Sequence, residues 1–390
     1  MAEAILEGNW NYPTSVRFGP GRIRELPQAL AELGIAKPLL VTDPVVAGLN
    51  ATAGILDVLR TARVPLRVFS DVKPNPVAKN VAAGVRAFRR GRHDGVVALG
   101  GGSALDAAKA VALMVGQSRP LFDFEDVGDN WTRIKPEGMA PVVAIPTTSG
   151  TGSEVGRSSV FVDERTRTKR IVFHPRMLPG KVILDPQLTL DMPPRLTGAV
   201  GMDALSHSLE AYCATGFHPL ADGIAVEAMR LVRFGLARAF EHGGDLAARS
   251  AMMAASAMGA TAFQKGLGAM HSVAHAVGGM FDTHHGTTIA VMMPYVLRFN
   301  RKAIDERLAR AAGYLGLARA SFAGFLDWVL GLRRKLGIPE RLDELGVTAK
   351  AVPELVERAA VDPTAGTNPV PLTTEALRGL VERAMTGRMS

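Results

Sequence analysis

The sequence predicts a doubly wound α/β domain followed by an all-α domain. Three observations support this fold class. Short β-branched runs alternate with amphipathic stretches up to about residue 190, the β-branched runs then disappear, and apolar residues afterwards recur at spacings of three and four. The chain has 390 residues, whereas a single domain typically has about 150. We therefore expect one domain over residues 1–190 and a second over residues 191–390.

The first half alternates predicted strands with predicted helices. The helices are expected over residues 22–33, 51–60, 77–90 and 104–115, and the strands over residues 39–42, 66–69, 96–99, 142–145, 160–162 and 182–184. Alternation of this kind is typical of parallel strands that lie between two layers of helices. We therefore expect a parallel sheet with both faces covered.

The second half has the period of helices. After Met192-Pro193-Pro194, long stretches rich in Ala, Leu and Met predict helices over residues 197–215, 219–241, 245–264, 301–315, 319–336 and 373–386. The proline-rich segment 361–372 is predicted to connect two late helices. This half is therefore expected to be all-α.

Composition excludes several classes of protein. Lys and Arg number 45 against 37 Asp and Glu, and only 6% of residues are aromatic, so no nucleic-acid surface is evident. The most apolar window, residues 95–116, contains Asp106 and Lys109, which argues against a membrane span. Residues 1–10 carry two glutamates where a signal peptide would be apolar, so we expect a cytoplasmic protein. A single cysteine, Cys213, leaves nitrogen and oxygen as the ligands for any metal.

A glycine loop, Gly100-Gly101-Gly102-Ser103, joins the strand 96–99 to the helix 104–115. Glycines at a helix N-terminus offer backbone N–H groups and the positive end of the helix dipole to a phosphate, and no Cβ blocks close approach. The loop differs from the Gly-x-Gly-x-x-Gly fingerprint, and it lacks the Lys-Ser/Thr of a nucleoside-triphosphate loop. The alternative interpretation is a tight turn between a strand and a helix.

Two other strand ends carry polar residues. The hydroxyl loop, residues 146–154, reads Pro-Thr-Thr-Ser-Gly-Thr-Gly-Ser-Glu and could hydrogen-bond a polar ligand, or it could be a flexible surface loop. Asp43 follows the strand 39–42, where its carboxylate could accept from ribose hydroxyls and repel a 2′-phosphate, or serve as a turn or cap residue. Together these strand ends indicate a nucleotide at the carboxyl edge of a Rossmann-like domain.

Seven of the nine histidines fall between residues 207 and 285. Five of them are candidates for one site, namely His207, His271, His275, His284 and His285. Asp203 precedes His207 by four residues on a predicted helix, which puts both on one face. One carboxylate with three imidazoles suits iron(II) or zinc(II). Spacing does not decide between His271 and His275, or between His284 and His285, and any single histidine could instead be a hydrogen-bonded core residue.

At these residues the sequence resembles the iron-containing (group III) alcohol dehydrogenases of the dehydroquinate synthase-like superfamily. The resemblance covers nearly the whole chain, and its specific motifs are residues 100–109, 146–154, 201–212 and 271–286. It implies an N-terminal nucleotide-binding domain, a C-terminal metal-binding domain, and a catalytic divalent metal between them. It also implies hydride transfer between a nicotinamide and a primary alcohol or hydroxy acid.

Carried over by position, the resemblance assigns individual residues. The metal ligands would be Asp203, His207, His271 and His285, holding Fe(II) or Zn(II), and His275 would relay protons. The NAD contacts would be Asp43, Asn75, Gly101, Gly102, Ser103, Thr147, Thr148, Lys169 and Leu188. The resemblance further implies that the carboxylate of Asp43 favours NAD over NADP, and that the enzyme is a homo-oligomer, either a dimer or larger.

Residues 217–223 and 263–268 are similar to those of 4-hydroxybutyrate dehydrogenases, which interconvert 4-hydroxybutyrate and succinate semialdehyde. A carboxylated substrate would need a cation, for which Arg157 and Lys265 are candidates, although each could instead be a solvated surface charge. Two alternatives differ in class. One is a metal-independent enzyme similar to maleylacetate reductases, and the other is a non-catalytic nucleotide-binding protein.

Overall fold

The structure is a computed structural model that describes Tyr12 and residues 14–389. The prediction about residues 1–10 lies outside this part of the chain. Contacts divide the described residues into two compact units, the first ending at Asp191 and the second continuing from Met192. Among the described helices, none has the length and apolar character that a bilayer crossing requires.

The first unit contains a six-stranded sheet with the strand order β1-β8-β5-β4-β2-β3. Its strands are β1 (Ser15–Phe18), β2 (Pro38–Val41), β3 (Arg67–Phe69), β4 (Gly95–Gly100), β5 (Val142–Pro146) and β8 (Lys181–Leu184). All neighbouring strands in this sheet are parallel. Strands β4 and β5 are buried along their whole length, as expected for central strands covered on both faces. The predicted parallel sheet is confirmed.

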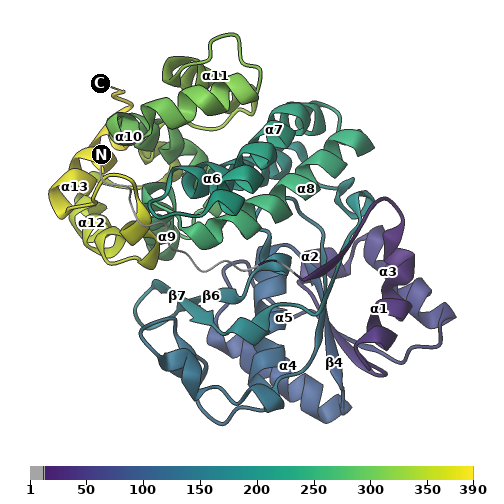
Figure 1. Cartoon of the computed structure of the whole chain (residues 1–390). Coiled ribbons are helices and arrows are strands. Elements are labelled where there is room, and N and C mark those ends of the chain that lie inside the picture. Colours follow the sequence, from purple (N-terminus) through teal and green to yellow (C-terminus); the bar gives the residue numbers. More distant parts are fainter. Residues whose placement is uncertain (1–11, 13, 390) are drawn as a thin grey trace. The chain divides into compact units, whose positions relative to one another are not determined.

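Helices cover both faces of this sheet (Figure 1). On one face, α1 (Leu26–Glu32) and α3 (Asn50–Thr61) contribute Leu30 and Ile55 to an apolar cluster that also contains Val97 of β4. The other face carries α4 (Ala78–Gly91) and α5 (Gly102–Met114). From β2 the chain goes to the edge strand β3 and then crosses to β4 on the other side of β2. The carboxyl ends of β2 and β4 therefore flank a topological switch point, the usual position of a ligand in such sheets.

Strands β6 (Ser158–Asp163) and β7 (Thr168–Phe173) form a separate antiparallel hairpin. The strand predicted at residues 160–162 is present as part of β6, but the expectation that it belongs to the parallel sheet was wrong. Only residues 164–167 separate the two strands, with Arg167 at a φ of 55° in the turn. A connection this short can join only antiparallel strands, because a parallel pair needs a crossover of a dozen or more residues.

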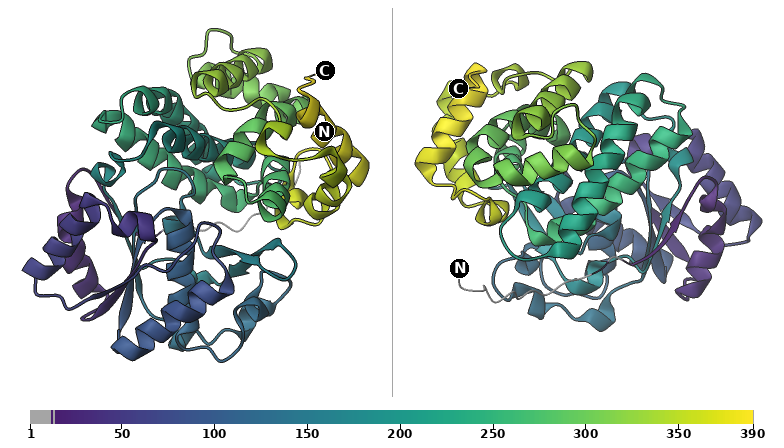
Figure 2. Two further views of the ribbon diagram at one scale, coloured as in Figure 1. Left: turned by 180° about the vertical axis from the view of Figure 1, so that it is seen from behind. Right: turned by 45° about the horizontal axis from the view of Figure 1, so that its top comes forward.

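The second unit is built from helices, which confirms the all-α prediction (Figure 2). They are α6 (Pro194–Cys213), α7 (Pro219–Glu241), α8 (Leu246–Ala262), α9 (Ala269–Phe281), α10 (His285–Tyr314), α11 (Phe322–Lys335), α12 (Val352–Ala360) and α13 (Thr374–Thr386). Helix α6 is buried from Thr197 to Cys213, apart from a half-buried Val200. Its neighbours α7, α8 and α10 enclose it on several sides.

The structure differs from the sequence prediction at three helices. Helices α9 and α12 were not predicted, and α10 begins at His285 rather than at residue 301. Pro294 lies inside α10, although proline normally ends or kinks a helix. Residues 289–297 are all buried, so tertiary packing outweighs the local preference there. Segment 361–372 does connect α12 to α13, as predicted.

Candidate metal centre and nucleotide edge

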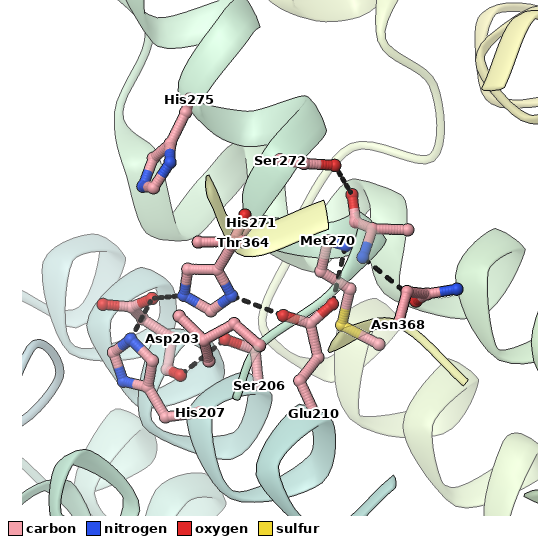
Figure 3. A network of polar contacts seen from close by, with 12 residues as sticks. Asp203, Ser206, His207, Glu210, Met270, His271, Ser272, His275, Thr364 and Asn368 are labelled. Atoms are coloured by element: carbon pink, nitrogen blue, oxygen red, sulfur yellow. Dashed lines mark hydrogen bonds and ion pairs between the residues drawn. The ribbon is translucent and has the colours of Figure 1, made fainter. Parts of the chain in front are cut away.

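Four side chains from three helices of the second unit converge, and Figure 3 shows Asp203, His207 and His271 of this group. Asp203 and His207 come from α6, His271 from α9 and His285 from the first residue of α10. The Nε2 atoms of His207, His271 and His285 lie 3.8, 3.9 and 3.8 Å from Oδ1 of Asp203. Four atoms held at about 2.1 Å around one tetrahedral ion are about 3.4 Å apart. Asp203, His207 and His271 therefore already lie close to the arrangement of a ligand shell, and His285 approaches the same carboxylate oxygen.

Two of these atoms have no hydrogen-bond partner among the described residues. Oδ1 of Asp203 and Nε2 of His271 are buried and accept or donate no hydrogen bond. Leaving a buried carboxylate oxygen unpaired is costly, and a bound cation removes that cost. Three imidazoles with one carboxylate, and no thiolate, form a donor set that suits Fe(II) or Zn(II). The residues present therefore fit a divalent metal ion.

Local sequence explains how these residues meet. Asp203, His207 and Glu210 are spaced by four and three residues, so they share one face of α6. Gly286 lets the start of α10 approach that face. A Cβ on Gly286 would lie 2.3 Å from the carbonyl oxygen of Ala199 and 3.4 Å from Cβ of Asp203. This close approach brings the neighbouring His285 beside Asp203.

Glu210 supports His271 and was not assigned a role from the sequence. Its Oε2 lies 2.6 Å from Nδ1 of His271, and its Oε1 accepts from the backbone N–H of Met270 at 2.7 Å. At the first residue of α9, the N–H group of Ala269 donates to Oδ1 of Asn368 at 3.1 Å. A bond at Nδ1 orients the ring so that Nε2 faces Asp203. The sequence did contain a signal for this role, because Glu210 follows His207 by three residues on the same helix.

His275 and His284 lie beside the cluster rather than in it. Nδ1 of His275 lies 2.9 Å from Oδ2 of Asp362, and its ring stacks on that of His285 with centroids 5.3 Å apart. His284 is the N-cap residue of α10. The structure thus places His271 and His285 around Asp203, where spacing alone had left two alternatives open in each case.

In the first unit, the glycine loop packs directly against the hydroxyl loop. A Cβ on Gly101 would lie 3.3 Å from the side chain of Thr148, and one on Gly102 would lie 2.6 Å from Oγ1 and 2.9 Å from Cβ of Thr151. The N–H of Thr147 donates to the carbonyl oxygen of Gly100 at 3.0 Å. Helix α5 begins at Gly102, so its N-terminal N–H groups lie at this edge of the sheet.

Asp43 lies at the same edge and acts as a helix cap. Its Oδ1 accepts from the N–H groups of Val45 and Val46, both at 2.9 Å, at the start of α2 (Pro44–Ala47). Its Oδ2 lies 3.4 Å from the position that a Cβ on Gly100 would take. One carboxylate oxygen thus caps α2 while the other lies next to the glycine loop.

The remaining residues assigned to the cofactor come from other parts of the first unit. Ser103 is the second residue of α5, and Leu188 is buried in the apolar cluster beneath the sheet. Asn75 follows β3 with a φ of 51°, and Lys169 lies in β7. The N–H of Val162 in β6 donates to the carbonyl oxygen of Pro76 at 2.9 Å, so the segment with Asn75 runs beside the hairpin.

Buried charges hold the hydroxyl loop to α5. Nζ of Lys109 donates to the carbonyl oxygens of Ser153 and Ser158 at 2.9 and 2.5 Å. Oδ1 of Asp106 accepts from Oγ of Ser153 at 2.5 Å. Burial lowers the pKa of Lys109 in spite of Asp106, and burial raises the pKa of Glu154 to about 7.

The two basic residues considered for a carboxylated substrate have partners inside their own units. Nζ of Lys265 lies 2.6 Å from Oδ1 of Asp222, whose Oδ2 accepts from Arg307 at 2.6 Å. The guanidinium carbon of Arg157 lies 5.6 Å from the ring centroid of Phe173. Lys265 and Arg307 thus share the single carboxylate of Asp222, and this group of three keeps a net positive charge.

Comparisons with known proteins agree with this architecture. Models of the iron-containing alcohol dehydrogenase family and of its C-terminal region match residues 13–186 and 197–385. The chain is 36% identical to the 4-hydroxybutyrate dehydrogenase of Cupriavidus necator, over 96% of this chain and 99% of that protein. The crystal structure of a 1,3-propanediol oxidoreductase superposes with a TM-score of 0.92 at 34% identity, covering 97% and 99% of the two chains.

A second solved structure contains a nucleotide. Sulfoacetaldehyde reductase from Bifidobacterium kashiwanohense, in complex with NAD+, superposes with a TM-score of 0.87 at 28% identity, covering 97% of this chain and 99% of that one. Family models thus match both units, and similar structures span nearly the whole chain. The chain therefore belongs to the iron-containing alcohol dehydrogenase family, and it is an oxidoreductase.

Proposed function

We propose that this protein is a metal-dependent, NAD-linked dehydrogenase that interconverts a primary alcohol or hydroxy acid with the corresponding aldehyde. The observation that carries the proposal is the convergence of three imidazole nitrogens within 3.9 Å of one unpaired carboxylate oxygen. When bound, a divalent cation polarises the oxygen of an alcohol or carbonyl group, and the nicotinamide of NAD accepts or returns hydride.

The second unit supplies the metal ligands and the proton relay. Asp203, His207, His271 and His285 would hold Fe(II) or Zn(II). His275 is the proposed relay, because its Nδ1 is engaged by a carboxylate and its other ring nitrogen can take a proton from the substrate hydroxyl and pass it to water.

The first unit would bind NAD along the carboxyl edge of its sheet. Gly101, Gly102 and Ser103 would face the pyrophosphate, since they form the start of α5. Thr147 and Thr148 would lie near the phosphates and the nicotinamide ribose. Oδ2 of Asp43 would accept from the adenosine ribose and disfavour NADP. Further contacts are proposed for Asn75, Lys169 and Leu188.

The substrate pair that we propose to test first is 4-hydroxybutyrate and succinate semialdehyde. The relative from Cupriavidus necator is named 4-hydroxybutyrate dehydrogenase, and the sulfoacetaldehyde reductase is also named for an anionic substrate. Arg157 and Lys265 are both candidates for binding the substrate carboxylate, since Lys265 shares Asp222 with Arg307 and Arg157 lies near Asp126.

The decisive experiment is turnover with defined metal and cofactor. Protein stripped by a chelator is reconstituted anaerobically with Fe(II) or Zn(II). It is then assayed with NAD or NADP against 4-hydroxybutyrate, propane-1,3-diol and butan-1-ol, and in reverse against succinate semialdehyde, butanal and lactaldehyde. We expect turnover only with metal, and faster turnover with NAD than with NADP. Full activity in stripped protein would favour the maleylacetate reductase-like alternative.

Two other outcomes of that experiment are informative. Binding of NAD without turnover of any substrate would support the non-catalytic alternative. Equal kcat/KM values for the acidic and neutral substrates would remove 4-hydroxybutyrate as the preferred substrate, while leaving the dehydrogenase activity in place.

We also propose that the enzyme acts as a homo-oligomer in the cytoplasm. The resemblance to the family supports the oligomer, and a buried cysteine without a disulfide is compatible with a reducing compartment. Light scattering at working concentration measures the assembly, and the mass of a single chain would contradict it.

A further inference from the structure

Asp362 contacts His275 from the segment between α12 and α13. Its Oδ2 lies 2.9 Å from Nδ1 of His275, although the two residues are 87 positions apart in the chain. Its Oδ1 accepts from the N–H of Thr364 at 2.9 Å and from Oγ1 of Thr364 at 2.5 Å. The side chains of Asp362 and His275 are each only 10% exposed. The carboxylate is thus fixed by its own loop and points one oxygen at the imidazole.

This contact determines which nitrogen of His275 carries hydrogen. Burial acts to raise the pKa of Asp362, but His275 and Thr364 outweigh it, so the pKa lies below its usual value. An ionised carboxylate only accepts hydrogen bonds, and Nδ1 of His275 must therefore donate. In the neutral ring, Nε2 is then the atom with the lone pair.

The orientation of the ring is fixed as well. The ring of His275 stacks on that of His285, at 5.3 Å between centroids and an interplanar angle of 14°. It meets the ring of His271 edge-on, with centroids 6.0 Å apart. Two proposed metal ligands thus bound the ring, and Asp362 holds its Nδ1 side.

We infer that Asp362 is a positioning residue, which holds His275 in the Nδ1–H tautomer and presents Nε2 as the proton acceptor. The inference rests on the proposed role of His275. In the alcohol-oxidising direction, the O–H bond of the substrate breaks and an Nε2–H bond forms. The imidazolium is stabilised by Asp362, which stays ionised, and its Nε2 proton then leaves to water. Segment 361–372 is therefore part of the site rather than only a connector.

A double-mutant cycle tests the inference. The variants are Asp362→Asn, His275→Ala and the combination of both, each assayed with reconstituted metal. We expect Asp362→Asn to lower kcat by about 10²-fold, since general-base catalysis contributes about 10²–10⁴-fold. The KM for NAD and the metal content should not change. In the His275→Ala background, the same substitution should change kcat by less than about twofold, because two residues that act through one step are not additive.

Three results would contradict the inference in distinguishable ways. An equal fall in kcat with and without His275, or loss of metal in Asp362→Asn, would show that Asp362 has only a structural role. An unchanged kcat in Asp362→Asn, with His275→Ala impaired, would remove the inference and leave the proposed relay intact. An unchanged kcat in His275→Ala would remove the relay itself.

Two further variants test whether a fall in kcat reflects only a general loss of structure. Thr364→Val removes the hydroxyl bond to Asp362 without touching His275, and it should lower kcat several-fold with metal retained. No change in kcat would count against the inference. Asp245→Asn is the matched control, because the carboxylate of Asp245 also accepts backbone and arginine hydrogen bonds, at the start of α8, and these come from Ala248 and Arg238 rather than from a histidine side chain. Its kcat should equal that of the wild type.

Discussion

Different parts of the polypeptide build the two proposed sites, which are the nucleotide edge at the glycine and hydroxyl loops and the metal centre around Asp203. At the nucleotide edge, the proposed contacts to the ligand come mainly from backbone N–H groups, and glycines without a Cβ leave room for close approach. These groups lie in loops that follow β4 and β5 directly. At the metal centre, side-chain atoms from three helices meet, and their supports come from far along the chain. The bond from His271 to Glu210 joins residues 61 positions apart, and that from Ala269 to Asn368 joins residues 99 apart.

This difference predicts which kinds of substitution impair each site. The nucleotide edge should be sensitive to added volume and tolerant of exchanged hydroxyls. The metal centre should be sensitive to any change of donor atom in a ligand, and also to changes in the residues that contact the ligands.

Asp203→Ala should have the largest effect. It removes the only carboxylate among the four converging groups, to which all three Nε2 atoms lie within 3.9 Å. Loss of several kcal/mol of charge stabilisation corresponds to a fall in kcat of about 10³-fold or more. Metal content measured after reconstitution should drop, whereas the Kd for NAD should stay constant. Weaker NAD binding of similar size would mean that the two sites are not independent.

Glu210→Gln should come next. The amide keeps the shape of the side chain but loses the charge that faces Nδ1 of His271 at 2.6 Å. Partners of metal-bound histidines are typically worth about 10–100-fold in metal affinity or activity. Competition with a chelator measures the affinity. Ser208→Ala is the control on the same buried helix, because Oγ of Ser208 bonds only to the carbonyl oxygen of Ala204. Equal losses in both variants would point to a general weakening of α6.

Gly102→Ala should impair the nucleotide edge alone. The new Cβ would lie 2.9 Å from Cβ of Thr151, so the glycine loop and the hydroxyl loop must separate. Overpacking of this kind costs about 1–3 kcal/mol, which corresponds to a rise of about tenfold or more in the Kd for NAD. Metal content should be unchanged. Gly54→Ala, where a Cβ meets nothing within 4 Å, is the matched control. Normal NAD affinity in Gly102→Ala would argue against binding at this loop.

Glu154→Gln should affect turnover least but change the pH dependence of stability. Burial raises the pKa of Glu154 to about 7 from the ordinary 4.5. Its contribution is therefore complete below about pH 4.5 and is lost as the pH rises through 7, because the unfolded chain ionises first. The difference amounts to about 3 kcal/mol. Thermal unfolding between pH 5 and 8 should show a steeper decline for the wild type than for the variant. Parallel curves would mean that Glu154 does not hold a proton in the folded state.

Some features could be predicted from the sequence because they are local. A strand that ends in glycines and continues as a helix specifies its own turn, so the loop at Gly100–Gly102 was identified without tertiary information. Spacing by four on one helix likewise placed Asp203 beside His207. The pairing of the strand at residues 160–162 was predicted wrongly, because a run of β-branched residues indicates a strand but not the strand with which it pairs.

Other features depend on contacts across long stretches of chain. Periodicity left His271 and His275 equivalent, and the structure distinguishes them by their partners. His271 contacts Asp203 and Glu210, whereas His275 contacts Asp362. Helix α10 starts at His285 in spite of Pro294 because burial in the second unit outweighs local preference. By itself, the sequence determined the α/β and all-α halves, the glycine loop and the set of groups able to bind a metal. Tertiary structure alone decided which histidines surround Asp203, because that depends on how closely α6, α9 and α10 approach, as Gly286 allows.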